Sequence, residues 1–483
     1  MRALRTLASI GLATLFCVAG PSRVRAWRHA TVDSEPGTTL FWRSRRVEIR
    51  SAYGTCVDAP ESAVRASVLQ ALNEWSTAGA GCADMSLVEG RTLAGSGSFA
   101  TNLDGGDPDH ENRLVWRQHD WPRADAGDVI ALTTLVYDRA TGAIVDADID
   151  VNGEDFYFTT TDDAGTVVTD VQNTVAHELG HVLGFGHSDI EEATMYGSSE
   201  PGDIGKRELD GDDVQAVCTV YPYGAPTPRG LGRSSGGLTS ASGCNVGGAG
   251  AGSGWLVVLA LGLALVLVAR RRARIAQHAA LETVARRGAR VARHAALLAV
   301  AVVSGLGLAP GRAHATVVVA FDLRELVDRA DEVALVEAID AHSLRDERGR
   351  IVTDTVVRVL ESVEGGARVG DTFVIRRLGG VVGDLGMHVE GEAELAPGDR
   401  AIVFAKRVAA DAPLRTVGMA QGVMPVRPNG TRDLVMPGGA GLVLVRPLAG
   451  GRLAAGTAAL SAPRALDELL DTLRTISADL RGP

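Results

Sequence analysis

Apolar residues recur at helical spacing in the first half of the chain. In residues 67–75, one face of the predicted helix carries Val68, Leu69, Leu72 and Trp75. A second helix is predicted over residues 171–183, with Asp170 at its N-cap.

The last third of the chain shows a different pattern, dominated by short apolar runs between turn signals. Strands are predicted over residues 333–339, 351–360, 372–376 and 401–404. Helices are predicted over residues 323–330 and 461–480. Residues 316–483 therefore form a β-rich domain whose function is unknown, since no chemical motif occurs there. A binding or accessory role is favoured over catalysis.

The N-terminus has the pattern of a secretory signal peptide over residues 1–26. Arg2 and Arg5 precede an apolar run, and Val24-Arg25-Ala26 offers a cleavage site. The alternative is a short membrane anchor that is not removed. Both interpretations predict export across the membrane.

Two further apolar segments interrupt the chain. A Gly/Ser/Pro-rich linker, residues 224–254, leads to an apolar run at 255–269 and an Arg-rich loop at 270–294. With Cys244 in the linker, this order resembles the C-terminal sorting signal of the MYXO-CTERM type. Such a signal ends its protein, whereas this chain continues to Pro483.

The segment 295–315 is itself similar to a signal peptide. Its apolar part, 295–309, is followed by the A-x-A site Ala313-His314-Ala315. The chain is then either a fusion of two exported proteins or a protein that spans the membrane through 255–269 and 295–309. Both interpretations place the Arg-rich loop in the cytoplasm and the flanking domains outside. The expected location is the cell envelope, membrane-anchored or, after processing, at the cell surface or secreted.

Composition narrows the function further. The 483 residues carry a formal net charge of -11, which argues against a nucleic-acid-binding protein. Hydrophobic residues make up 46% of the chain, enough for packed cores, so a wholly disordered chain is excluded.

The strongest chemical signal is the run from His177 to His187. His177 and His181 lie one turn apart on one helical face, and Gly184 suits the positive φ that ends a helix and returns His187 to the same metal. Three imidazoles leave one position of a zinc ion open, as in catalytic sites. Glu178 is placed to act as general base toward a zinc-activated water.

This pattern is that of the metzincin proteases, and Met195 supplies the methionine turn that these proteases share. Together with Ser188 and Tyr196, the site resembles the matrixins. Residues 129–137 and 144–152 look like the pair of strands that precede the active-site helix in this family, and residues 209–221 look like its terminal helix. The resemblance implies an α+β zincin fold over residues 27–223, with a twisted sheet and an active-site helix. It also implies one catalytic zinc, and protein or peptide substrates lying along the 129–137 edge strand. Residues 189–205, with Tyr196 among them, would shape the specificity pocket.

Two acidic clusters are candidate calcium sites. One lies in a Gly-rich loop and comprises Asp104, Asp107, Asp109 and His110. The other, Asp146, Asp148 and Asp150, shares one face of a predicted strand. The alternatives are a solvated acidic turn for the first and a solvated strand face for the second.

Export favours oxidised cysteines. Cys56 and Cys82 flank the first predicted helix, and a disulfide between them would tie its ends. Cys218 is then free, or replaces one partner.

The principal hypothesis is an exported zinc endopeptidase. The alternatives are a non-catalytic surface adhesin that keeps the zincin fold, and a two-part product whose second half binds or restrains the protease.

Overall fold

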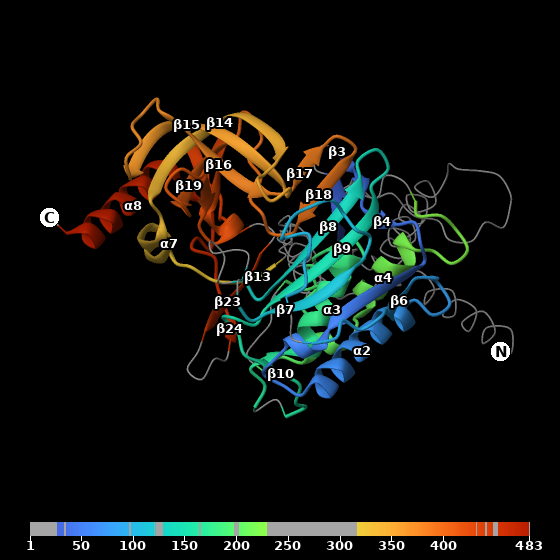
Figure 1. Ribbon diagram of the computed structural model, residues 1–483. Helices are drawn as coiled ribbons and strands as arrows, with labels where there is room; N and C mark the ends of the chain where they lie inside the picture. Colours follow the sequence, from blue (N-terminus) through green and yellow to red (C-terminus); the bar gives the residue numbers. More distant parts are fainter. Residues whose placement is uncertain are drawn as a thin grey trace, which may run out of the picture. The chain divides into compact units, whose positions relative to one another are not determined.

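The computed structural model describes residues 27–32, 35–95, 98–119, 121, 129–163, 166–197, 202–228, 316–430, 432–439, 442–447 and 453–482 (Figure 1). The predicted signal peptide, the apolar segments 255–269 and 295–309 and the Arg-rich loop lie outside these residues. None of the described helices is long and apolar enough to span a membrane. All of these described residues belong to one compact unit.

A mixed sheet forms the centre of the first half. Its strands lie in the order β8, β9, β7, β5, β6, and β8 runs antiparallel to β9 while the others run parallel. Their bounds are β5 (Arg46–Ala52), β6 (Ser86–Glu89), β7 (Arg113–Arg117), β8 (Ala131–Asp138) and β9 (Ala143–Asn152). Short strands complete this half: β1 (Arg28–His29), β2 (Thr31–Val32), β3 (Glu35–Thr39), β4 (Phe41–Trp42), β10 (Phe158–Thr159), β11 (Thr169–Asp170) and β12 (Phe185–Gly186).

Two helices cover this sheet and bury the apolar face predicted for the first of them. They are α2 (Glu61–Ala78) and α3 (Val171–Val182). Val68, Leu72 and Trp75 of α2 join the same buried cluster as Leu179 of α3. The predicted cap at Asp170 is confirmed, since its carboxylate accepts a hydrogen bond from Asn173 N at 2.7 Å. A third helix, α4 (Gly211–Val220), and the 3-10 turns η1 (Tyr53–Thr55) and η2 (Gly205–Arg207) complete the α+β fold.

The predicted pairing of Cys56 with Cys82 is wrong. Cys82 is bonded to Cys218 of α4, with 5.2 Å between their Cα atoms, while Cys56 is a buried free thiol. Cys56 and Cys82 lie before and after α2, and an 18-residue helix holds its ends about 27 Å apart. No disulfide can bridge that distance. The Cys82–Cys218 disulfide instead ties the end of α2 to α4.

The second half is β-rich, as predicted. Its main sheet has the order β14-β15-β16-β20-β19-β21-β22-β25, with β14 also paired to β19. The bounds are β14 (Glu332–Arg345), β15 (Ile351–Glu364), β16 (Thr372–Leu378), β19 (Arg400–Arg407), β20 (Leu414–Thr416), β21 (Val423–Asn429), β22 (Arg432–Val435) and β25 (Arg464–Ala465). A smaller sheet joins β13 (Thr316–Val319), β23 (Leu442–Pro447) and β24 (Leu453–Ala455), and η3 (Met419–Gly422) is a 3-10 turn.

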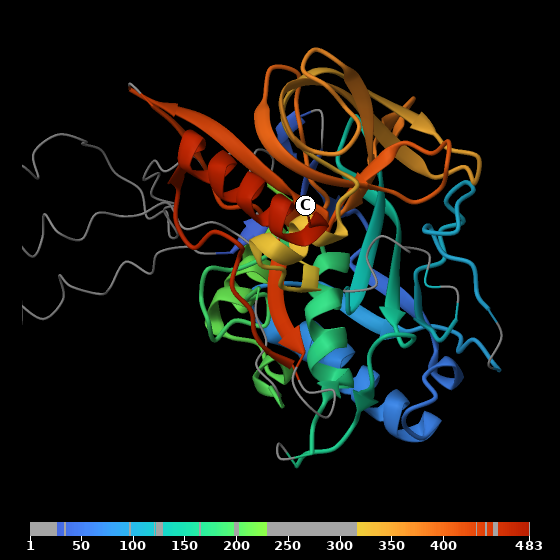
Figure 2. The same cartoon turned by 90° about the vertical axis from the view of Figure 1, so that its left-hand side faces the viewer.

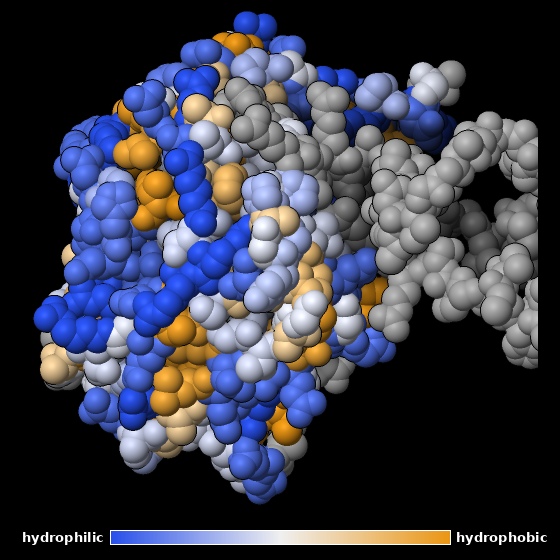
Figure 3. All heavy atoms as spheres, turned by 90° about the vertical axis from the view of Figure 1, so that its right-hand side faces the viewer, coloured by the Kyte–Doolittle hydropathy of each residue, from blue (hydrophilic) through white to orange (hydrophobic). Residues whose placement is uncertain are grey.

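Two helices pack on this main sheet. The predicted helices appear as α7 (Leu323–Arg329) and α8 (Leu466–Arg481), which contact each other and share a buried cluster with β19 and β21 (Figure 2). Leu469, Leu470 and Leu473 are the buried positions of α8. The described surface seen in Figure 3 is mostly hydrophilic, with apolar side chains in small separate groups.

A hairpin from the second half extends the sheet of the first. It consists of β17 (Gly380–Val382) and β18 (Leu385–Val389), and β18 pairs antiparallel with β8 (Figure 1). The full order of this sheet is therefore β17-β18-β8-β9-β7-β5-β6. The two halves thus share one continuous sheet, although the sequence predicts them as separate domains.

Candidate metal centre

The three predicted histidine ligands converge on one point. His177 and His181 project from α3, and His187 follows β12. Their candidate ligand atoms all lie within 4.8 Å of one another, and all three side chains are buried. Among the described residues, no other group of three or more His, Cys, Asp or Glu side chains meets this criterion.

Backbone carbonyls fix the orientation of two of these rings. His177 Nδ1 donates to Thr194 O at 2.7 Å, and His181 Nδ1 donates to Phe185 O at 2.8 Å. With the proton held on Nδ1, each Nε2 presents a lone pair to the centre, which is the form that binds a metal. His177 Nε2 is buried and has no hydrogen-bond partner among the described residues. This set of donors fits a zinc ion.

The turn that brings His187 back depends on Gly184. Its φ is +81°, as the sequence predicts, and a Cβ there would lie 2.6 Å from Leu40 O. Gly184 O accepts from Ala30 N at 3.0 Å, and β1 pairs with β12 beside it. The N-terminal strand thus holds the turn that carries the third ligand.

Met195 packs against α3, the helix that carries His177 and His181. A Cβ on Gly180 would lie 2.1 Å from Met195 Sδ, so α3 and the methionine turn touch at a position where only glycine fits. The turn is held by Ser188 N, which donates to Met195 O at 2.8 Å. It is also held by the buried carboxylate of Asp213, which accepts from Thr194 N at 2.7 Å and Met195 N at 3.0 Å.

Glu178 lies between α3 and β8. Its Oε2 accepts a hydrogen bond from Thr133 Oγ1 at 2.6 Å. Burial raises the pKa of Glu178, while the Thr133 hydrogen bond works against that rise. A carboxylate with a raised pKa is a more effective proton acceptor near neutral pH.

Sequence reasoning missed Lys206, which is one of only two lysines in the chain. Its side chain is only 3% exposed, and Nζ donates to Tyr196 O. Burial lowers the pKa of Lys206 to about 8, against the opposing charges of Asp203 and Asp213. Lys206 thereby fixes the backbone at Tyr196, the predicted pocket residue, which pairs with Ser188 in a β-bridge. The rarity of lysine was the signal that could have drawn attention to it.

The strand acids Asp146, Asp148 and Asp150 are buried, so the expectation of a solvated strand face is wrong. Asp150 pairs with Arg117 at 2.6 Å. Asp148 accepts from Asn102 N and Arg113 N at 2.8 Å each. Loop amides and arginine guanidinium groups therefore satisfy much of this face.

In the Gly-rich loop, Asp104 pairs with Arg117 at 2.6 Å and Asp109 with Arg113 at 2.7 Å. Arginines thus occupy oxygens that a calcium ion would need. Calcium binding at either acidic cluster stays a prediction.

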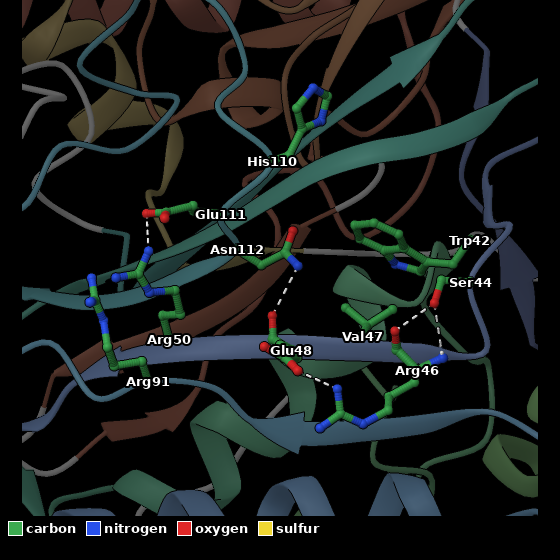
Figure 4. Close-up of a pocket in the computed structure, with 10 residues that line it drawn as sticks. All are labelled: Trp42, Ser44, Arg46, Val47, Glu48, Arg50, Arg91, His110, Glu111 and Asn112. Atoms are coloured by element: carbon green, nitrogen blue, oxygen red, sulfur yellow. Dashed lines mark hydrogen bonds and ion pairs between the residues drawn. The ribbon is translucent and has the colours of Figure 1, made fainter.

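A pocket of about 580 Å³ lies near β5, with His110 at one side (Figure 4). Its charged residues pair with each other: Arg50 with Glu111, and Arg46 with Glu48. Asn112 Nδ2 donates to Glu48 O at 2.9 Å. None of the three zinc-ligand candidates lines this pocket, so it is separate from the metal centre.

Comparison with protein families agrees with this geometry. Residues 118–222 match the family model described as matrixin. This region, which contains α3, the histidines and the methionine turn, is similar to a matrixin domain and lies in a chain with an α+β fold.

Individual relatives match this chain over short stretches only. The chain is 39% identical to Metalloendoproteinase 5-MMP of Arabidopsis thaliana over 70 residues, which are 14% of this chain and 18% of that protein. It is 38% identical to Metalloendoproteinase 2-MMP of the same organism over 85 residues, 17% of this chain and 21% of that protein. Karilysin of Tannerella forsythia is 46% identical over 55 residues, 11% of each chain. The chain thus spans about a fifth of the length of the plant relatives it matches.

Proposed function

We propose that this protein is a zinc-dependent endopeptidase that hydrolyses peptide bonds in proteins or peptides. The observation that carries the proposal is the convergence of three buried imidazoles on one point, with Glu178 beside them on the same helix. The homology to matrixin metalloendoproteinases supports it. His177, His181 and His187 would hold the zinc.

The chemistry that zinc would supply when held by these residues is polarisation of the substrate carbonyl and a lowered pKa of the attacking water. Glu178 takes a proton from that water as its oxygen attacks the carbonyl carbon. Glu178 then delivers the proton to the amide nitrogen as the C–N bond breaks. Thr133 holds the carboxylate in place through the 2.6 Å hydrogen bond. The substrate would lie extended along the outer edge of β8, which β18 occupies in this structure.

We further propose that the protein is exported and acts at the cell envelope, membrane-anchored or released after processing. The signal-like segment 1–26 and the apolar segments 255–269 and 295–309 support this location. The Cys82–Cys218 disulfide also supports it, because such bonds persist in oxidising compartments.

The proposal is tested by measuring zinc content and casein hydrolysis on the full chain, wild type beside Glu178→Ala. We expect one zinc per chain in both proteins. We expect kcat to fall by about 10²–10⁴-fold in the variant, the usual contribution of a general base. His342→Ala, an exposed histidine in the second half, is the control and should keep both properties.

Two other results would overturn the proposal. Zinc without hydrolysis in either protein, even after β18 is displaced from β8, would favour the alternative of a non-catalytic surface-binding protein. Absence of zinc in the wild type would contradict the metal site itself.

A further inference from the structure

Strand β8, which the sequence predicts as an edge strand, has a neighbouring strand on both sides. One side pairs with β9, and the other pairs with β18 of the second half. The pairing runs from Leu385 opposite Asp138 to Val389 opposite Thr134, in antiparallel register. Arg139 N extends it by donating to Asp384 O at 2.9 Å. A segment of this chain therefore holds the edge along which an extended peptide would bind.

The register carries this segment to the proposed catalytic residues. Val389 pairs with Thr134, and the neighbouring Thr133 binds the Glu178 carboxylate. Glu390 comes next, and it lines a pocket of about 370 Å³ together with His187 and His388. Its carboxylate is 2.8 Å from His388 Nε2.

The chain does not continue past the metal centre as an extended strand. Glu392 N donates to Val389 O at 3.4 Å, so the backbone turns immediately after β18. Gly391 O then accepts from Ala420 N at 3.2 Å, within the second half. Residues 385–389 therefore occupy only the part of the β8 edge that leads up to the metal centre. Because the backbone turns there, this segment does not place an extended peptide bond across the metal centre, as a substrate would.

Contacts away from the strand edge hold the two halves together. Met387 and Val389 are buried in one cluster with Leu132 and Val129 of the first half. At the far side, Arg345 pairs with Asp107 at 3.0 Å. The edge pairing and part of the apolar contact fall on β18. Val318, which bridges Val129, and Val445, which is buried in the core cluster of the first half, join the halves elsewhere.

Among the glycines of the β17–β18 hairpin, Gly386 has the closest fit. A Cβ built there would lie 2.1 Å from the Tyr137 ring, which is buried on β8. Gly386 has no positive φ, so a side chain at this position strains only the contact with β8.

From this geometry we propose that residues 380–392 are an intrinsic inhibitory segment, which occupies the peptide-binding edge of β8 and must leave before a substrate binds. The inhibition of hydrolysis rests on the proposed function, whereas the occupation of β8 by this segment does not. The occupant competes with substrate for β8, so it reduces the fraction of binding-competent protein. Its removal therefore lowers KM and leaves kcat nearly unchanged.

The test compares wild-type full chain with Gly386→Ala, using Gly366→Ala as the matched control. A Cβ at Gly366, also in the second half, would meet its nearest neighbour at 3.6 Å, which is ordinary contact. Hydrogen exchange of the β8 amides reports occupancy, and casein hydrolysis reports competition. We expect faster exchange at β8 and a KM lowered about tenfold in Gly386→Ala only.

The outcomes separate the two proposals. Equally fast exchange at β8 in all three proteins would overturn the inhibitory segment, whatever the activity. Faster exchange in Gly386→Ala with equal, measurable hydrolysis in all three would also overturn it. Faster exchange in Gly386→Ala, with zinc bound and no hydrolysis in any protein, would support the occupancy and overturn the proposed function.

Discussion

The two halves of this chain meet on β8 and contribute to it in different ways. The first half supplies side chains whose chemistry is fixed by type and spacing: three imidazoles and a carboxylate on and after α3. The second half supplies a strand backbone and, at Gly386, the absence of a side chain. Side-chain chemistry leaves a motif in the sequence, whereas backbone complementarity leaves almost none.

The largest effect is expected from removing a histidine side chain that the first half contributes to the metal centre. His181→Ala removes one of the three proposed zinc ligands, so bound zinc should fall from one per chain toward zero. Casein hydrolysis should fall by about 10³-fold or more, since the zinc supplies several kcal/mol to the reaction. Metal analysis and hydrolysis on the same sample check this. A variant that keeps a full equivalent of zinc would show that the three imidazoles are not the ligand set.

The next effect concerns the support beneath the ligands. Asp213→Ala leaves the buried amides of Thr194 and Met195, and the partly buried amide of Asp210, without their acceptor. Each lost partner costs about 1–3 kcal/mol, so we expect the free energy of unfolding to fall by about 4 kcal/mol. Urea denaturation measures it. A loss below about 1 kcal/mol would mean that the methionine turn is held by other contacts.

A pH-dependent effect is expected from Lys206. Its pKa is about 8 in the folded protein and 10.5 when unfolded, because burial disfavours the charged amine. Between these values the unfolded chain binds the proton and the folded chain does not, so the stability that depends on Lys206 rises with pH. Relative to Lys206→Met, wild type should gain about 2 kcal/mol between pH 8 and pH 10.5. The free energy of unfolding is measured by urea denaturation at each pH. If it changed with pH equally in the two proteins, this prediction would be contradicted.

The smallest effect tests the second half. Arg345→Ala removes an exposed ion pair with Asp107, which is worth about 0.5 kcal/mol. Hydrogen exchange at β8 should rise about twofold. Arg358→Ala, whose partner Glu337 lies within the second half, should leave β8 unchanged. Equal exchange rates at β8 in both variants would show that the Arg345–Asp107 ion pair does not help to hold the second half on β8.

Much of the catalytic half could be predicted from sequence, for physical reasons that the structure makes plain. The 3.6-residue period places His177 and His181 on one face, and Gly184 has the positive φ that the motif requires. Thr133, Lys206 and Asp213 were missed because they reach the site through the fold and not through spacing along the chain. The disulfide was mispaired because sequence proximity to α2 ignores the length of that helix.

The hairpin was missed for another reason. Glycines at 379, 380, 383 and 386 weaken the apolar alternation of residues 380–389, so the strands give little β-propensity signal. The two-residue turn at Gly383 and Asp384 was a usable signal, since Val382 pairs directly with Leu385. The pairing of β18 with β8 depends on long-range complementarity, which no local pattern records.

Because the hairpin and β8 belong to one polypeptide, their encounter is intramolecular. Its effective concentration is then set by the connecting segment 229–315 and not by how much protein is present. Dilution would leave an intact chain closed. A single cut in the connecting segment would turn the same contact into a bimolecular one, which dilution dissociates. The covalent continuity of the chain thus determines whether the cleft responds to protein concentration.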